Sequence, residues 1–163
     1  WEDALPPRLR LAYLPSANGI KLSLSAYETG GGMREEITAK FRELERLIPD
    51  NVLGYGDDIT VEAAVATLLR ERGATLAVAE SCTGGRIASR FTAMAGASEY
   101  FLAGVMSYSH DAKSDILGVD PQAIIDYGAA SREVAEQIAQ GNRRIAGWDY
   151  AIATTGVAGP PGG

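Results

Sequence analysis

The stretch Thr75-Leu-Ala-Val-Ala-Glu-Ser-Cys-Thr-Gly-Gly85 decides the fold class of this chain. It begins as an apolar run, typical of a strand buried on both faces, and ends in hydroxyl side chains and two glycines before a helical pattern. A buried strand that leads into a helix is typical of a parallel sheet in an α/β protein. Ligands bind such sheets at the carboxyl ends of the strands, so we expect a site in the loop after Glu80.

The sequence on either side of this stretch alternates between strand and helix patterns. Asp120 and Pro121 are typical of an N-cap and a first helical position, and Ser131 is a second candidate cap. The pattern predicts an α/β fold of three layers, with helices on both faces of a mostly parallel (mixed) sheet. We expect this domain over residues 51–163, with strands at 75–80, 101–108 and 149–154 and helices at 61–72, 85–94, 112–117 and 131–145.

Residues 1–50 predict a small ββα (α+β) module. Arg10–Leu14 is a short apolar run, and Ile20–Tyr27 alternates as a half-buried strand does. A helix follows and ends before Pro49. Its apolar face is formed by Ile37, Phe41, Leu44 and Ile48. Two strands and one helix bury little surface, so we expect this module to lean on another part of the protein.

Composition excludes several classes of protein. The chain is 46% hydrophobic and 22% charged, as globular proteins are, and its net charge of −6 argues against binding to nucleic acid or to an anionic membrane. No apolar run reaches the roughly 20 residues that span a bilayer. A single cysteine, Cys82, and a single histidine make an internal disulfide or a zinc site improbable. We expect a cytoplasmic protein without a metal or cofactor.

The loop after Glu80 supports two interpretations. Ser81 is a candidate nucleophile, and the start of the following helix offers N–H groups and a positive dipole end to a phosphate or an oxyanion. Alternatively, Ser81 or Thr83 only caps that helix, since serine and threonine are common caps. Cys82 is a rival nucleophile, but we expect it to be a small buried residue.

A second loop, after the strand at 101–108, supplies two candidate bases for Ser81. His110 would give a Ser-His arrangement and Lys113 a Ser-Lys pair, and the residues alone leave this choice open. Lys113 can act at neutral pH only if burial or a nearby cation lowers its pKa. Residues 154–160 follow the last strand and offer further donors at a strand end, or form an ordinary turn.

Several ordered motifs resemble the C-terminal domain of the CinA (competence/damage-inducible) family, whose members include nicotinamide mononucleotide deamidases. They are A-E-S-C-T-G-G (Ala79–Gly85), G-V-D-P-Q-A-I…Y-G-A-A-S-R-E-V-A (Gly118–Ala135) and D-Y-A-I-A-T-T-G-V-A-G-P-P-G-G (Asp149–Gly163). L-P-P-R-L-R-L-A-Y-L-P (Leu5–Pro15) is similar to the small middle module of the family's long members. Those members also carry an amino-terminal domain linked to ADP-ribose hydrolysis.

The resemblance implies hydrolysis of the carboxamide of nicotinamide mononucleotide to nicotinate mononucleotide and ammonia, in pyridine nucleotide salvage. It implies Ser81 as nucleophile and Lys113 as base, with no cofactor. His110 stands where the family commonly has Asn. The positions that the resemblance implies for substrate binding or loop support are Glu80, Thr83, Gly84, Ser98, Tyr108, Thr155 and Gly156.

A second function class stays open beside the amidase: a non-catalytic nucleotide-binding or regulatory module, in which the same loop only holds a phosphate. In either case we expect a small nucleotide as ligand and a homo-oligomer, most simply a dimer. Because the family's K-P-V-G-T-V continuation does not follow Gly163, we also expect a domain cut before its last elements.

Overall fold

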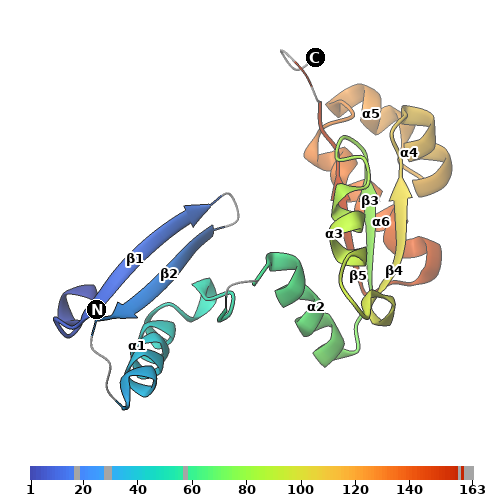
Figure 1. Cartoon of the computed structure of the whole chain (residues 1–163). Helices are drawn as coiled ribbons and strands as arrows, with labels where there is room; N and C mark the ends of the chain where they lie inside the picture. The colour runs from blue at the N-terminus through green and yellow to red at the C-terminus, as the bar shows by residue number, and fades with distance from the viewer. Residues whose placement is uncertain (17–18, 28–30, 57–58, 158, 160–163) are drawn as a thin grey trace. The chain divides into compact units, whose positions relative to one another are not determined.

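We describe the protein from a computed structural model that covers residues 1–16, 19–27, 31–56, 59–157 and 159. The chain divides into two compact units, Trp1–Val61 and Glu62–Gly163. Figure 1 shows the strands and helices of both units. The division lies later in the chain than the boundary expected at residue 51, because a short connector with the 3₁₀ helix η2 (Pro49–Asn51) belongs to the first unit.

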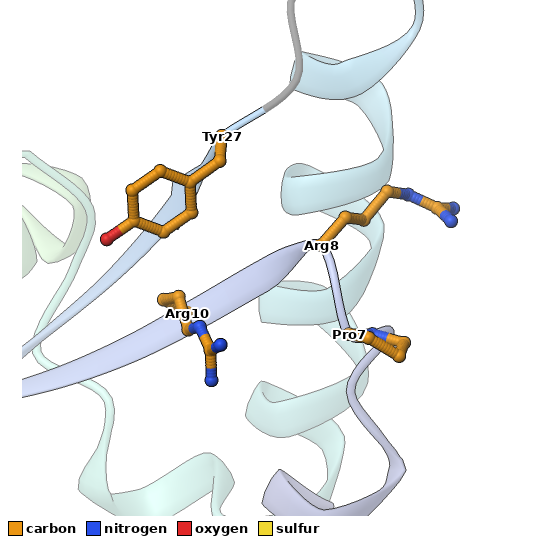
Figure 2. Close-up of a pocket in the computed structure, with 4 residues that line it drawn as sticks. All are labelled: Pro7, Arg8, Arg10 and Tyr27. Carbon is orange, nitrogen blue, oxygen red and sulfur yellow. The ribbon is translucent and has the colours of Figure 1, made fainter.

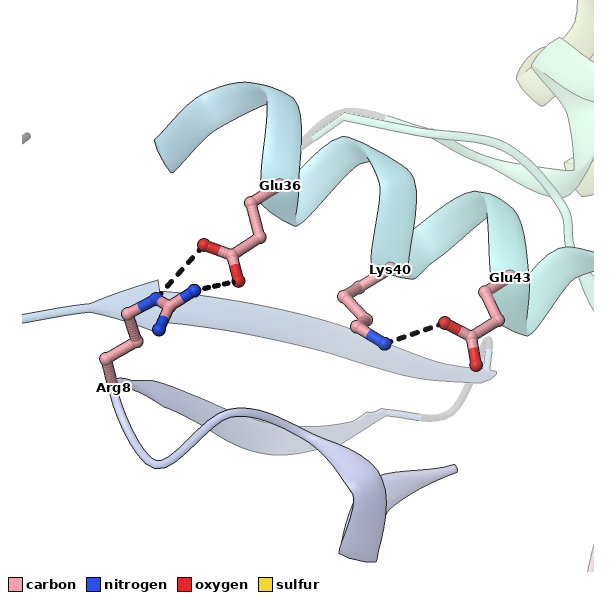
Figure 3. A network of polar contacts seen from close by, with 4 residues as sticks. All are labelled: Arg8, Glu36, Lys40 and Glu43. Atoms are coloured by element: carbon pink, nitrogen blue, oxygen red, sulfur yellow. Dashed lines mark hydrogen bonds and ion pairs between the residues drawn. The ribbon is translucent and has the colours of Figure 1, made fainter. Parts of the chain in front are cut away.

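The first unit contains a β-hairpin and one helix. Strands β1 (Leu9–Ser16) and β2 (Gly19–Ala26) pair antiparallel, and the 3₁₀ helix η1 (Glu2–Ala4) precedes them. Helix α1 (Met33–Leu47) follows and ends just before Pro49, as expected. Arg8 forms a two-pronged ion pair with Glu36 of this helix, at 3.1 and 2.6 Å (Figure 3). Leu9 is the one buried residue among those described in this unit, so its core is small.

The second unit is built on a three-stranded parallel sheet in the order β4-β3-β5. The middle strand β3 (Leu76–Glu80) is buried along its whole length, as the apolar run predicted. Its neighbours are β4 (Phe101–Met106) and β5 (Tyr150–Thr154). All the described pairings of this sheet are parallel, which confirms the predicted α/β fold class.

Helices cover both faces of this sheet, each with its own apolar core. On one face, α2 (Val61–Arg72) and α3 (Arg86–Thr92) pack around Leu76 of β3. On the other face lie α4 (His110–Leu117), α5 (Pro121–Tyr127) and α6 (Arg132–Ala146), which pack around Ala79 of the same strand. Alternate side chains of a strand point to opposite faces, so one central strand supplies both cores. The result is the three-layer arrangement expected from the sequence.

The ends of the helices follow local signals in the sequence. Asp120 caps α5 by accepting from the Gln122 N–H, with Pro121 at the first helical position, and Ser131 caps α6 by accepting from the Val134 N–H. Between α3 and β4 lies a short 3₁₀ helix, η3 (Ala97–Glu99), that the pattern did not predict. No helix among the described residues is long and apolar enough to cross a membrane.

Candidate active site

Three hydroxyl residues lie side by side where the three parallel strands end. Ser81, Ser107 and Thr155 each follow the last residue of β3, β4 and β5. The ladder continues through them, because the Ser107 N–H donates to the Glu80 carbonyl (2.9 Å) and the Ser81 N–H to the Thr154 carbonyl (3.0 Å). The site predicted at the carboxyl edge of the sheet therefore has polar side chains from all three strands.

Lys113 reaches this edge from the first turn of α4. Its amine donates to Ser81 Oγ at 3.2 Å, to the Ser107 carbonyl at 2.9 Å and to the Tyr108 carbonyl at 3.1 Å. The helix is held in place by Ser109, whose side chain accepts from the Ala112 N–H. The structure thus brings together the two residues, Ser81 and Lys113, that were expected to share a proton.

Both members of this pair are buried. Ser81 is 5% exposed and Lys113 is 2% exposed. Burial lowers the pKa of Lys113, because a charged amine loses its hydration, and the nearby Cys82 acts in the other direction without reversing the shift. The direction of this shift is the one that a lysine acting as a base requires.

Glu80 holds the loop that carries Ser81. It is 1% exposed and directs its carboxylate to the opposite face of the sheet, where it accepts from the N–H groups of Ile87 (3.0 Å) and Ala88 (2.8 Å). Burial alone would raise the pKa of Glu80. Hydrogen bonds from the Ala88 N–H, the Thr83 hydroxyl and two further backbone N–H groups outweigh burial, so the pKa is lowered.

This anchor corrects one prediction from the sequence. We expected the start of the helix after Gly84 to present N–H groups to a ligand, or to be capped by Ser81 or Thr83. Neither side chain caps α3, whose N-cap is Gly85, and Glu80 takes two of its first N–H groups instead. The N-terminus of this seven-residue helix is therefore already occupied by the Glu80 carboxylate.

The turn between Ser81 and α3 leaves other donors near the nucleophile. The Gly84 N–H bonds back to the Ser81 carbonyl at 3.0 Å, and Gly84 has a positive φ of 60° that favours glycine. Within the described part of the chain, the N–H groups of Cys82 and Thr83 donate no hydrogen bond. The Cys82 N–H directly follows the candidate nucleophile, where hydrolases of this layout place an oxyanion donor.

The other expected binding residues from the strand ends also lie at this edge. The Thr155 hydroxyl donates to the Ala129 carbonyl at 2.6 Å, and Thr83 and Thr154 share a hydrogen bond of 2.7 Å. Gly156 passes so close to Cys82 that an added Cβ would lie 3.0 Å from its sulfur. The side chain of Tyr108 is exposed, while its carbonyl binds Lys113.

Ser98 and His110 are not brought to Ser81. Ser98 lies in η3, before β4 begins, and five to six strand residues separate that edge of the sheet from the Ser81 edge, about 17 Å. His110 is the first residue of α4 and is exposed. The geometry therefore pairs Ser81 with Lys113. Cys82 is partly exposed, which contradicts the expectation that it would be buried.

Sequence reasoning missed Ser107. Its carbonyl binds Lys113, and its side chain is fully buried with no hydrogen-bond partner among the described residues. The signal was present as a hydroxyl residue at the end of an apolar run, the same pattern that marked Ser81.

The first unit contains a hollow of its own, lined by Pro7, Arg8, Arg10 and Tyr27 (Figure 2). The Arg8 guanidinium there is already paired with Glu36. No cluster of three or more His, Cys, Asp or Glu that could hold a metal occurs in the part of the chain that the structure describes. We therefore place the candidate site at Ser81 and Lys113.

Fold and site together define a class: three-layer α/β domains with a buried hydroxyl and amine at the carboxyl edge of a parallel sheet. Residues 58–163 match the family model described as "CinA C-terminal domain". The chain belongs to the CinA family, as the motifs of the sequence indicated.

Relatives in this family match almost the whole chain. CinA-like proteins of Salinibacter ruber and Flavobacterium psychrophilum are 44% and 40% identical over 99% and 98% of the chain. The chain spans only 39% and 38% of their lengths.

Solved structures of the family have the same fold. The competence/damage-inducible protein CihA from Agrobacterium tumefaciens is 40% identical, with a TM-score of 0.61, and the match covers 63% of this chain and 62% of that one. The competence-damaged protein (CinA) superfamily protein from Escherichia coli is 34% identical, with a TM-score of 0.63, over 69% and 68% of the two chains.

Proposed function

We propose that the Glu62–Gly163 unit is an amide hydrolase in which Ser81 is the nucleophile and Lys113 is its base. The observation that carries this proposal is the 3.2 Å contact between Lys113 Nζ and Ser81 Oγ, with both side chains buried. A serine hydroxyl becomes a good nucleophile when an adjacent base takes its proton. Lys113 is the one titratable group among the described residues that contacts this hydroxyl.

The two carbonyls around Lys113 support its role as a base. A neutral amine has two N–H donors and one lone pair, and the carbonyls of Ser107 and Tyr108 can only accept. When Lys113 is neutral, its two hydrogens point to these carbonyls and its lone pair faces the Ser81 hydroxyl. Burial lowers the pKa of Lys113 and so favours this neutral form.

The reaction then follows in two halves. In the first half, the Ser81 proton moves to Lys113 while Oγ bonds to the amide carbon, and the carbonyl π electrons move to oxygen. The oxyanion re-forms its double bond, the C–N bond breaks, and the Lys113 ammonium returns the proton to the departing nitrogen, so ammonia leaves. In the second half, water attacks the acyl ester, Lys113 takes its proton, and that proton returns to Ser81 as the acid is released.

The substrate we propose is nicotinamide mononucleotide, which would give nicotinate mononucleotide and ammonia. Two observations support an amide substrate that is part of a nucleotide. The Cys82 N–H lies next to the nucleophile and is uncommitted among the described residues, as an oxyanion donor must be. Thr83, Thr155 and Gly156 also lie at this edge, where nucleotides bind in open α/β sheets.

Ammonia release from nicotinamide mononucleotide tests the proposal. We expect the chain to release ammonia, and we expect Ser81→Ala and Lys113→Met each to lower kcat by at least about 10³. Ser89→Ala is the matched control, because Ser89 is an exposed hydroxyl residue of α3 and its loss should leave the rate unchanged. Undiminished turnover in Ser81→Ala would remove Ser81 from the mechanism.

One observation favours a second function, that of a nucleotide-binding module without catalysis. The three acceptors around Lys113 also match the three donors of a charged ammonium, which would hold an anion and could not take a proton. Calorimetry that shows binding of nicotinamide mononucleotide, with no ammonia released over hours, would favour this second function over the amidase.

A further inference from the structure

Ser107 presents an unexplained buried hydroxyl beside the candidate dyad. The residue is 0% exposed, and its Oγ has no hydrogen-bond partner within the described ranges. A buried hydroxyl without a partner costs free energy, so a native protein that keeps one needs a reason. An alanine would fill the same place without this cost.

The strand register places this hydroxyl next to Ser81. Val105 of β4 pairs with Ala79 of β3, and Met106 pairs with Glu80. The hydrogen bond from the Ser107 N–H to the Glu80 carbonyl carries the ladder one pair farther, to Ser107 and Ser81. Neighbouring strands lie about 4.8 Å apart, and paired residues of a ladder point to the same face. Val105 and Ala79 both pack on the α4 and α6 side, so Ser107 and Ser81 point to that side too.

The hydrogen bonds of Lys113 show why a second hydroxyl is useful there. A protonated Lys113 needs three acceptors and has the carbonyls of Ser107 and Tyr108 together with Ser81 Oγ. In the tetrahedral intermediate, Lys113 carries the proton taken from Ser81, and Ser81 Oγ is bonded to two carbons, which makes it a weaker acceptor than the free hydroxyl. The ammonium is then one acceptor short while it is still buried.

We propose that Ser107 is a positioning residue for Lys113: the Ser107 hydroxyl oxygen accepts the third hydrogen of the Lys113 ammonium while Ser81 Oγ is bonded to the tetrahedral carbon, before the proton passes to the departing nitrogen. The proton on Lys113 is the one taken from Ser81, and no other group is oxidised, reduced or transferred. The catalytic role of Ser107 rests on the proposed function, but the hydrogen bond between its hydroxyl and the Lys113 ammonium does not.

In the described part of the chain, no charged side chain is placed to accept the third ammonium hydrogen of Lys113, which leaves that role to an uncharged group. Cys82, which follows Ser81, is the titratable neighbour that acts on the pKa of Lys113. Glu80 directs its carboxylate to the N–H groups of α3 on the other face of β3. On α4 itself, Asp111 and Asp115 are exposed. No carboxylate among the described residues therefore contacts the ammonium.

Lysine NMR tests the contact without any substrate. The chain has three lysines, Lys21, Lys40 and Lys113, so 13Cε-lysine labelling gives three resonances, and Lys113→Met assigns the buried one. In Ser81→Ala, the Ser107 hydroxyl should replace the lost acceptor, and the pKa of Lys113 should change little. Adding Ser107→Ala to that variant should lower the pKa by about one pH unit, a tenfold change in the proton affinity.

The controls separate hydrogen bonding from packing. Ser107→Cys keeps the side-chain size but supplies only a weak acceptor, so it should lower the pKa of Lys113 in the Ser81→Ala background as Ser107→Ala does. It also serves if the alanine variant fails to fold. Ser89→Ala should leave the pKa unchanged in the same background. If neither Ser107 variant moves the pKa of Lys113, the proposal is wrong.

Kinetics separate this inference from the proposed function. In an active chain, Ser107→Ala should lower kcat and shift its pH profile while KM stays within about twofold, because the residue acts after substrate is bound. If the NMR coupling is present but no amide is ever hydrolysed, the amidase proposal fails and the contact stands. If the chain is active but shows no coupling and no shifted profile, the inference about Ser107 fails by itself.

Discussion

Glu80→Gln is the most direct test of how the loop of the candidate site is held. The carboxylate is buried and accepts two backbone N–H groups of α3, at 2.8 and 3.0 Å. A hydrogen bond to a charged group contributes about 1.5–3 kcal/mol, and a neutral one about 1 kcal/mol. Gln keeps one acceptor oxygen but sets an NH₂ group against the second N–H. We therefore expect a loss of about 2–4 kcal/mol in the free energy of unfolding.

Urea unfolding followed by tryptophan fluorescence measures this loss of unfolding free energy in the Glu62–Gly163 unit, which contains Glu80. The chain has two tryptophans, and a Trp1→Phe background leaves Trp148, which lies between α6 and β5 of the second unit. Glu99→Gln is the matched control, because Glu99 pairs with Arg70 at 3.0 Å on an exposed surface. Exposed pairs contribute little, so that variant should unfold almost as the parent does.

The pH dependence provides a second check on Glu80. Its folded pKa is lowered below the unfolded value of about 4.3, so its ionisation contributes stability that is fully present above that value. This stability is lost as pH falls through the folded pKa. The difference between parent and Glu80→Gln should therefore be largest near pH 7 and shrink in acid. A difference below about 1 kcal/mol at pH 7, or one that stays constant down to pH 3, would refute this account of the anchor.

Three further predictions concern the same unit. Because burial lowers the pKa of Lys113, amide hydrolysis should rise with pH through that pKa; the parent should also gain stability relative to Lys113→Met between the folded pKa and about 10.4, as paired urea titrations would show. Gly141→Ala would set a Cβ 1.8 Å from the Leu117 carbonyl oxygen, which should destabilise the unit by about 3 kcal/mol or more. Circular dichroism should therefore show a lower Tm, and an unchanged Tm would contradict the packing of α6 against α4. Thr155→Val removes the 2.6 Å hydrogen bond to the loop after α5, so urea unfolding should show a loss of about 1 kcal/mol, whereas Thr155→Ser should keep most of it.

Much of the fold followed from local patterns along the chain. The buried run before Glu80 and the alternation after it predicted a parallel α/β sheet, and the caps at Asp120 and Ser131 predicted where two helices begin. These features depend on neighbours within a few residues, through strand periodicity and capping hydrogen bonds. The sequence could therefore show them without any knowledge of tertiary contacts.

The choice of partners at the site was decided only by the tertiary structure. The residues alone left His110 and Lys113 as equal candidates, and only two residues of α4 lie between the exposed imidazole and the buried amine. Ser98 was predicted to bind substrate but lies at the far edge of the sheet. Ser107 was not predicted as a site residue, and only the strand register sets it beside Ser81. Such distances depend on how strands align and which helix face is buried, and these are set by packing between segments distant in sequence.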